Sequence, residues 1–408
     1  MLRHLPILFI VFTVLIDGIG IGLIFPVMPD LIRDVTGRTL ADAALWGGVL
    51  ATGYAVMQFL FGPIVGNLSD RFGRKPVLIS ALFVMMLDYL VMAVAHTIWL
   101  LLIGRLIAGL TAATHATAAA YMADISAPED REKRFGLVHA AMGGGFAVGP
   151  MIGGLLAGID TRAPFYAAAG IAGLNMIFGL LVMPESLTRD KRRPFHWTRA
   201  NPFAAFRAIG SLSGVKPLLL VFGLYEMAYF VYPAIWSFYG VEKFGFDARM
   251  IGLTLFAFGL SMGLAQSVLI GPLVSRFGAY RVTMGGILAD IVVFATLGVT
   301  SSVPLVWIVT ILSGISSVTL PALQGTMSRA TPDTQQGELQ GVIGSIAAMA
   351  TILSPLIMTE TFAIFSRPGT AHYLPGAPFL LSMAIVILAG IVLWRWRVRR
   401  AGSEPKPA

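Results

Sequence analysis

The dominant feature of the sequence is a series of long apolar runs separated by short clusters of charged residues. A helix that crosses a bilayer needs about 20 mainly apolar residues, and the chain of 408 residues supplies roughly twelve such runs. Only 12% of the residues are charged, whereas charged residues make up about 25% of a typical soluble domain. A soluble core cannot bury so many apolar segments. The sequence therefore predicts an all-α membrane protein with twelve transmembrane helices.

Each predicted span lies between two charged or turn-forming segments. The spans are Leu5–Met28, Trp46–Val65, Val77–Ala95, Ile98–Ala120, Phe135–Ala157, Pro164–Met183, Leu218–Tyr239, Ile251–Val274, Val282–Val299, Val303–Met327, Gly337–Phe365 and Ala377–Trp394. The first span contains Asp17 and lacks a small-residue cleavage site, which indicates a retained helix rather than a signal peptide.

Positive charges are distributed unevenly over the predicted loops. If the N-terminus is cytoplasmic, most of the 29 Lys and Arg residues fall in loops on the cytoplasmic side. The positive-inside rule then predicts that both termini are cytoplasmic. The same distribution accounts for the net charge of +8, so the basic composition does not indicate a nucleic-acid partner. The absence of cysteine excludes disulfides, thiolate catalysis and Cys-ligated metal sites.

The two halves of the sequence resemble each other at a spacing of about 205 residues. The matching pairs are Phe72-Gly73 with Phe277-Gly278, Pro150 with Pro355, Asp88 with Asp290 and Gln58 with Gln266. Parallel repeats of this kind are typical of transporters, so we expect two six-helix pseudo-repeat bundles. The predicted organisation is an N-terminal bundle at 1–183, a basic cytoplasmic linker at 184–217, a C-terminal bundle at 218–394 and a cytoplasmic tail at 395–408.

Five charged residues lie deep inside predicted spans: Asp17, Asp88, Arg105, Glu226 and Asp290. Glu360 is nearer the outer end of its span and is a weaker candidate. A charge near the bilayer centre costs at least about 2.5–3.5 kcal/mol, so a helix that carries one is expected to use it. Alternating access requires a substrate to be held near the midplane, where we place the four acids. A buried carboxyl group can load and release a proton, and a proton can compete with a cationic substrate for it. The alternative is that each acid only pairs with Arg105 or with a helix terminus.

Several uncharged or titratable side chains in the spans are further candidates. His115 can titrate near neutral pH, or it can be a neutral side chain bonded to a neighbouring helix. Gln58, Gln266 and Gln324 can orient a substrate or join helices by hydrogen bonds. Tyr229 and Trp236 lie in an aromatic-rich segment beside Glu226, where they can line a cavity for a planar ligand or simply pack.

A glycine-rich stretch at 142–154 superficially resembles a nucleotide-binding loop. No strand is predicted before it and no Lys-Ser/Thr pair follows it, so the nucleotide interpretation fails. Small residues at helical spacing, with a proline, indicate close helix packing and a bend.

The motifs resemble those of the major facilitator superfamily, in its drug/proton antiporter branch. The loop after the second span carries Gly66, Asp70, Arg71, Gly73 and Arg74, and the resemblance implies that Asp70 and Arg71 form a charge network that stabilises the outward-open state. Arg105-Leu-Ile-Ala-Gly109 is similar to a fourth-helix motif linked to proton transfer. Gly145, Gly149 and Pro150 belong to a stretch similar to the antiporter motif of the fifth helix.

Other segments resemble the tetracycline/proton antiporters more closely, among them the run from Ile16 to Pro29, Asp88-Tyr89, Asp124 with its neighbours, Pro184-Glu185-Ser186, Ala289-Asp290 and Leu320 to Gln324. The resemblance implies roles in substrate and proton movement for Asp17, Asp88 and Asp290. Three positions depart from the pattern: Met262 replaces a histidine, His115 replaces a glycine, and Glu226 stands where glutamine is expected. Substrate choice is therefore open, with tetracycline as the leading candidate.

We therefore expect a proton-coupled antiporter that exports a small amphipathic drug, with protons and the lipid bilayer as its other partners and a monomer as the working unit. No cofactor and no protein-bound metal are expected; Mg²⁺ would arrive only with a chelated substrate. The alternative on the same fold is an uptake symporter or a metabolite exporter. An enzyme or a receptor is disfavoured because the sequence shows no nucleophile–base pair, no metal cluster and no sizeable soluble module.

Overall fold

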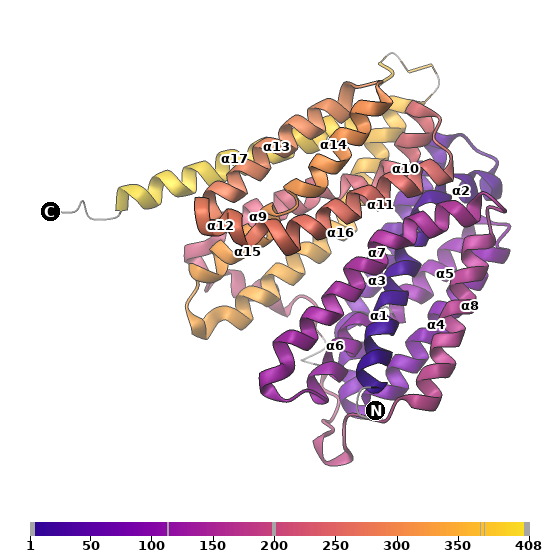
Figure 1. The fold of residues 1–408 in the computed structure, drawn as a ribbon, viewed down its shortest axis with the longest axis vertical. Coiled ribbons are helices and arrows are strands. Elements are labelled where there is room, and N and C mark those ends of the chain that lie inside the picture. Colours follow the sequence, from indigo (N-terminus) through magenta and orange to yellow (C-terminus); the bar gives the residue numbers. More distant parts are fainter. Residues whose placement is uncertain (1–4, 112–113, 198–200, 368, 371, 404–408) are drawn as a thin grey trace. The chain divides into compact units, whose positions relative to one another are not determined.

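The computed structural model describes residues 5–111, 114–197, 201–367, 369–370 and 372–403. Within this part of the chain the secondary structure is helical throughout (Figure 1). Eleven helical stretches are long and apolar enough to cross a membrane, and Ile98–Leu110 is a shorter apolar helix in the position of the fourth predicted span. The protein is an all-helical, multi-pass membrane protein, which confirms the predicted fold class.

The helices of the N-terminal part are α1 (Leu5–Ile24), α2 (Met28–Thr36), α3 (Leu40–Phe72), α4 (Arg74–Val94), α5 (Ile98–Thr111), α6 (Thr114–Asp124), α7 (Arg131–Ala157) and α8 (Ala163–Val182). Those of the C-terminal part are α9 (Lys216–Tyr229), α10 (Val231–Phe244), α11 (Ala248–Leu264), α12 (Ile270–Phe277), α13 (Ala279–Val299), α14 (Val303–Ser316), α15 (Thr319–Arg329), α16 (Gln336–Ser366) and α17 (Ala377–Ser403). Inside a bilayer only such helices satisfy the backbone polar groups within one segment.

Many helices extend past the predicted spans. Helix α3 begins at Leu40 and ends at Phe72, whereas the predicted span is Trp46–Val65, and α17 continues to Ser403. The prediction follows the apolar run, but a helix continues through polar residues where headgroups or water surround its ends. Thr39 caps α3 by accepting a hydrogen bond from the Asp42 backbone N–H at 3.2 Å.

Several spans are interrupted near their middles. Helices α9 and α10 meet at Phe230, and α14 and α15 meet at Ser317-Val318. Between α11 and α12 the residues Ala265–Leu269 form a π-helical turn. Interruptions of this kind are common at functional sites in membrane helices.

Contacts divide the chain into two compact units. Unit 1 comprises Met1–Pro202 and Gly245–Gly259, and unit 2 comprises Phe203–Phe244 and Leu260–Ala408. Matching residues of the sequence repeat occupy matching places within them. Gly73 ends α3 with φ 110° and Gly278 ends α12 with φ 79°, a backbone conformation that favours glycine. Pro150 and Pro355 both lie inside helices, in α7 and α16.

The glycine-rich stretch of α7 is a packing surface in unit 1, where α1 lies beside α7 (Figure 1). A Cβ atom at Gly145, Gly149 or Gly153 would overlap the α1 backbone at Leu15, Ile19 or Leu23. Only glycine permits this approach, so the interpretation as a helix-packing motif agrees with the contacts.

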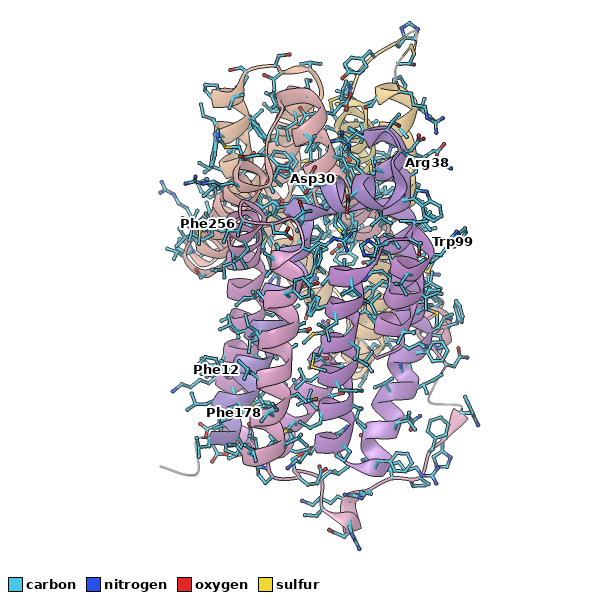
Figure 2. The ribbon with its side chains drawn as sticks, turned by 90° about the vertical axis from the view of Figure 1, so that its right-hand side faces the viewer. Phe12, Asp30, Arg38, Trp99, Phe178 and Phe256 are labelled. Carbon is cyan, nitrogen blue, oxygen red and sulfur yellow. The ribbon has the colours of Figure 1, made fainter. Side chains whose placement is uncertain are left out.

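The core of unit 1 and its outer surface are both apolar. Phe9, Tyr121 and Met122 are completely buried in the core. On the surface Phe12 is 51% exposed and Trp99 is 64% exposed, and Figure 2 shows them toward opposite ends of the helices, with Arg38 near Trp99. Exposed aromatic side chains along a bundle are expected for a surface that faces lipid.

Candidate functional site

Polar residues inside the apolar helices form one cluster in each unit. The cluster of unit 1 is built on α1, α3, α4 and α5 from Asp17, Tyr54, Asp88, Tyr89 and Arg105. Arg105 forms an ion pair with Asp88, and the side chains are only 14% and 4% exposed. The Arg105 guanidinium also lies 5.6 Å from the centroid of the Tyr54 ring. Asp17 interacts electrostatically with Tyr54 and Tyr89.

This pairing bears on the two interpretations of the intramembrane acids. Asp88 is the acid that Arg105 neutralises, so for Asp88 the ion-pair alternative has a structural basis. Within the described residues, however, Asp88 Oδ1 and Arg105 Nε are buried without a hydrogen-bond partner. Buried polar atoms are nearly always bonded to protein or water. These two atoms can therefore bind water or a polar group of a substrate.

The cluster of unit 2 surrounds Asp290 on α13, whose side chain is completely buried. The Tyr225 hydroxyl on α9 donates to Asp290 Oδ2, and the Ser316 hydroxyl at the end of α14 donates to Asp290 Oδ1. Ser316 Oγ is also 2.9 Å from the Ser313 carbonyl oxygen. Tyr229 donates to the same carbonyl at 3.0 Å. Two interrupted spans, α9 to α10 and α14 to α15, thus each supply one hydroxyl donor to the Asp290 carboxyl group.

An aromatic cluster continues from Asp290 along α9 and α10. The Tyr225 and Tyr229 rings stack at 5.6 Å, and Tyr232 lies 5.4 Å from Tyr229. Trp236 is 2% exposed and its ring is 6.2 Å from that of Phe379. These rings pack against one another in this conformation, and a role for Tyr229 and Trp236 in a substrate cavity stays a prediction.

The remaining predicted residues are distributed over both units. Glu226 is half-buried on the last turn of α9, just before the interruption at Phe230. Gln266 lies in the π-helical turn and donates to Ser317 Oγ at 3.3 Å, which is the helix-joining role that the sequence left open. Met262 and Gln324 are half-buried, and Gln58 is exposed on α3. The side chain of His115 lies outside the part of the chain that the structure describes.

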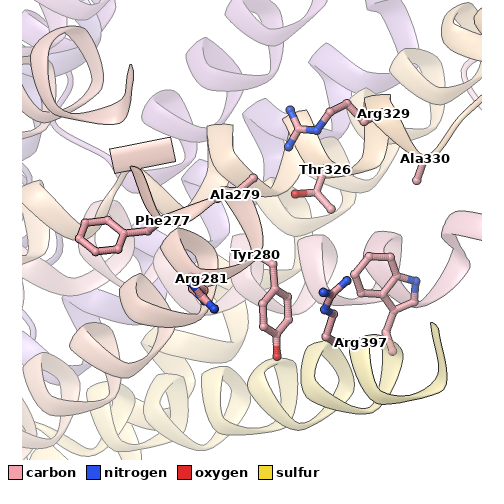
Figure 3. Close-up of a pocket in the computed structure, with 10 residues that line it drawn as sticks. Phe277, Ala279, Tyr280, Arg281, Thr326, Arg329, Ala330 and Arg397 are labelled. Carbon is pink, nitrogen blue, oxygen red and sulfur yellow. The ribbon is translucent and has the colours of Figure 1, made fainter. Parts of the chain in front are cut away.

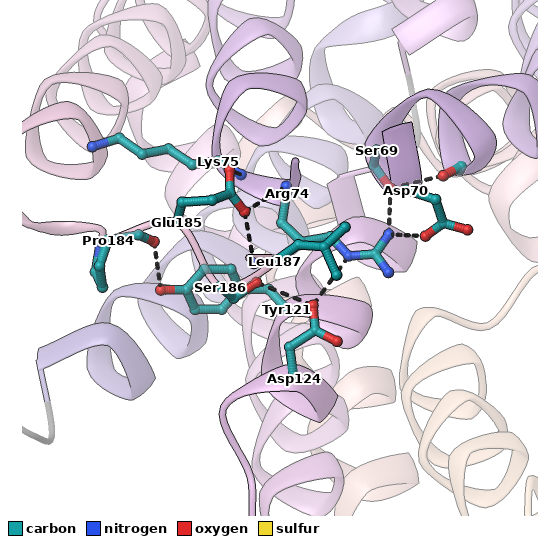
Figure 4. A network of polar contacts seen from close by, with 11 residues as sticks. Ser69, Asp70, Arg74, Lys75, Tyr121, Asp124, Pro184, Glu185, Ser186 and Leu187 are labelled. Carbon is teal, nitrogen blue, oxygen red and sulfur yellow. Dashed lines mark hydrogen bonds and ion pairs between the residues drawn. The ribbon is translucent and has the colours of Figure 1, made fainter. Parts of the chain in front are cut away.

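A second polar network in unit 1 involves the loop between α3 and α4 (Figure 4). Arg74 pairs with Asp70 at 2.7 Å and with Asp124 at 3.2 Å. This differs from the expectation that Arg71 completes the network: Arg71 lies over the Phe72 ring at 5.2 Å instead. Gly73 ends α3 with φ 110°, so Arg74 begins α4 and reaches Asp70 across this turn, whereas the Arg71 side chain lies over Phe72.

Glu185 joins this network to the start of the linker. Its carboxylate accepts hydrogen bonds from the backbone N–H groups of Arg74 at 2.8 Å, Lys75 at 3.2 Å and Leu187 at 3.0 Å. The first two N–H groups belong to the N-terminus of α4, where a carboxylate satisfies unpaired donors and the helix dipole. From the sequence, Glu185 stands out only as part of the Pro184-Glu185-Ser186 motif. Its role at the N-terminus of α4 was missed, because the sequence does not show which helix end its side chain reaches.

Comparisons with known proteins agree with this architecture. The family model described as Major Facilitator Superfamily matches residues 10–247 and 218–408. The chain belongs to the Major Facilitator Superfamily. This confirms the predicted membership, and the protein is a transporter of this superfamily rather than an enzyme.

Two relatives of this superfamily member are tetracycline resistance proteins of Escherichia coli. The class C protein is 40% identical over 391 residues, which is 96% of this chain and 97% of the relative. The class B protein is 36% identical over 85% of this chain and 86% of the relative. Among solved structures, the nucleoside transporter NupG superposes with a TM-score of 0.76 over 97% of this chain and 98% of NupG at 13% identity, which supports the fold alone.

Proposed function

We propose that this transporter exports a small amphipathic drug in exchange for protons, with tetracycline as the first substrate to test. The observation that carries the proposal is Asp290, a completely buried acid bonded to Tyr225 on α9 and to Ser316 at the end of α14, two helices that each belong to an interrupted span. The relatives that match across most of the chain are named tetracycline resistance proteins, which supports the substrate class.

In the proposed cycle, substrate binds from the cytoplasm and is displaced after outward opening, when protons bind the intramembrane acids. Asp17 and Glu226 are suited to loading and release because the side chain of each is only partly buried. Asp88 is held by Arg105, so a proton on Asp88 would release Arg105 from its ion pair. Each acid can thus link its protonation to a local rearrangement.

We place the transporter in a bacterial inner membrane with both termini in the cytoplasm, as two six-helix bundles at 1–183 and 218–394 joined by the linker at 184–217, and working as a monomer. The positive-inside distribution supports this orientation. Asn67 lies on the side of the linker and donates to the His196 carbonyl at 3.0 Å. Asn67 itself is buried, so the labelling position on this side is Ala127, an exposed residue between α6 and α7. A cysteine at Ala127 should react with a membrane-impermeant thiol reagent only from the cytoplasm, and a cysteine at Thr161 only from outside. The reverse labelling would overturn the orientation.

The identity of the substrate depends on residues such as Met262, which departs from the family pattern. The Met262 thioether cannot bind a proton and is a poor ligand for a divalent ion, whereas the histidine of the family pattern can titrate. This favours a second candidate, export or uptake of another organic solute on the same fold, over strict recognition of a Mg²⁺-chelated drug.

The deciding experiment is a drug-susceptibility panel in an efflux-deficient host that expresses wild type, Asp17→Asn or Asp190→Asn. Asp190 is an exposed linker acid, so its variant removes the same charge outside the membrane. We expect resistance to tetracycline with wild type and Asp190→Asn, and sensitivity with Asp17→Asn. Full sensitivity with wild type across the panel, or resistance that persists in Asp17→Asn, would contradict the proposal.

A further inference from the structure

A cavity in unit 2 has no part in the transport proposal. It has a volume of about 580 Å³ and lies where the ends of α12, α13, α15 and α17 meet. Its polar lining comes mainly from Arg281, Arg329 and Arg397, and its aromatic lining from Phe277, Tyr280 and Trp396 (Figure 3). The volume is that of a site for a small molecule or a headgroup.

The charges of this cavity are not balanced within the described chain. None of the residues that line it is acidic, and among the described residues none of the three arginines forms an ion pair. The Arg397 guanidinium lies 5.7 Å from the centroid of the Tyr280 ring, which orients it but does not neutralise it. Three guanidinium groups around one cavity favour an anion with several oxygens, because each presents a fork of donors.

The sequence repeat shows why the imbalance is specific to unit 2. In unit 1 the matching loop end is neutralised internally, because Arg74 pairs with both Asp70 and Asp124. At the spacing of about 205 residues, Asp70 corresponds to Ser275 and Asp124 to Arg329. One acid is thus matched by a neutral residue and the other by a basic one. Unit 2 therefore lacks, at these two positions, the acids that pair with Arg74 in unit 1 and leaves its exposed arginines open to an external anion.

The surroundings of the cavity match those of a lipid headgroup. It lies at the helix ends that the proposed orientation places at the cytoplasmic surface, and the inference rests on that part of the proposed function. Phe277 on the cavity rim is 47% exposed. Aromatic side chains are enriched at headgroup depth, and basic pockets between membrane helices on this side bind anionic headgroups.

We propose that the cavity formed by Arg281, Arg329 and Arg397 binds the phosphate of an anionic phospholipid headgroup. A phospholipid headgroup and free inorganic phosphate share the phosphate group that the arginines would bind. The aromatic rim favours the lipid, because a lipid can contact Phe277 with its glycerol and acyl portions and inorganic phosphate cannot. The lipid would hold the ends of α13, α15 and α17 together through one group.

The test is native mass spectrometry of the purified full-length protein in detergent, titrated separately with phosphatidylglycerol, phosphatidylcholine and inorganic phosphate. The variant is Arg281→Gln/Arg329→Gln. The matched control is Arg395→Gln/Arg399→Gln, which removes two charges from α17 beside the cavity but outside its lining. Because the readout is binding, it does not depend on substrate export or on orientation.

We expect phosphatidylglycerol to bind wild type and the control alike, and to bind the variant about 100-fold more weakly, at about tenfold for each charge-assisted hydrogen bond that the substitutions remove. Phosphatidylcholine should bind more weakly than phosphatidylglycerol. Equal binding of phosphatidylglycerol to variant and control would overturn the site. Arginine-dependent binding of inorganic phosphate that displaces phosphatidylglycerol would overturn the lipid assignment. A single Arg397→Gln substitution gives a second measurement if the double variant does not fold, and unchanged lipid binding there would also count against the site.

Discussion

The ion pair between Asp88 and Arg105 makes a quantitative prediction about stability. The pair lies within unit 1, with side-chain exposures of 4% for Asp88 and 14% for Arg105. The substitution Asp88→Asn keeps the size of the side chain and removes its charge. Arg105 then stays positively charged in an apolar helix, with the Tyr54 ring as its remaining partner.

The expected cost follows from this burial. Removing one partner of a buried ion pair destabilises a protein by about 3–5 kcal/mol, mostly because the other charge is left uncompensated. We expect the lower end, about 3 kcal/mol, because the Tyr54 ring still faces the guanidinium. Replacing both partners removes the isolated charge, so Asp88→Asn/Arg105→Gln should recover about 2 kcal/mol relative to Asp88→Asn.

The assay is reversible unfolding in mixed micelles of wild type, both single variants and the double variant. Asp34→Asn is the matched control: it breaks the pair with Arg162 at 2.9 Å, but Asp34 is 61% exposed. An exposed pair contributes about 0–1 kcal/mol, so the control should stay close to wild type. The reasoning is refuted if Asp88→Asn costs no more than Asp34→Asn, or if the double variant is as unstable as the two single effects added together.

Three further predictions concern other contacts. Tyr225→Phe removes a donor from the buried carboxyl of Asp290 and should lower the free energy of unfolding by about 1–3 kcal/mol, measured in the same assay; an unchanged value would mean that the bond does not stabilise the protein. Gly149→Ala places a Cβ atom against the Ile19 carbonyl oxygen, so it should lower the free energy of unfolding by about 1–3 kcal/mol and reduce transport. At Gly143 a Cβ atom would meet open space, so Gly143→Ala should be neutral. Equal effects of the two substitutions would contradict the packing of α1 on α7. Glu185→Ala leaves N–H groups at the start of α4 unpaired and should cost about 0.5–2 kcal/mol, with faster proteolysis of the linker; an unaltered cleavage rate would argue against its role.

Much of the fold was predictable because the bilayer restricts what an apolar run can become. The apolar runs form the helices, and the fourth span appears as α5 and α6 on either side of residues 112–113. The ends were not predictable, because hydropathy marks the hydrocarbon region and a helix continues beyond it. The interruptions at Phe230 and at Ser317-Val318 were not predicted, although the sequence carries a signal for each. Pro233 and Pro321 follow the two breaks, and each lacks the N–H that would bond the carbonyl four residues earlier.

The charged residues of the candidate site could be predicted from the sequence, but the residues that hydrogen-bond or pair with them could not. Asp17, Asp88, Arg105 and Asp290 stand out because a charge in an apolar span is costly. Tyr225 and Ser316 reach Asp290 from positions 65 and 26 residues away in the chain, and one sequence does not reveal such contacts. A serine cluster at 313–317 in an apolar span was the one available signal. Arg74, rather than Arg71, is the partner of Asp70 because the chain turns at Gly73 and places Arg74, at the start of α4, within reach of Asp70.

Substrate-driven proton movement in proteoliposomes tests the central claim most directly. Vesicles containing the purified transporter and an internal pH indicator are given an outward or inward tetracycline gradient, with wild type, Asp290→Asn and Asp333→Asn compared at equal protein content. Asp333 is an exposed acid at the start of a 3₁₀ turn, so Asp333→Asn controls for charge alone. The account predicts proton movement opposite to the drug with wild type and Asp333→Asn, and none with Asp290→Asn. Drug-coupled proton movement that persists in Asp290→Asn would contradict it.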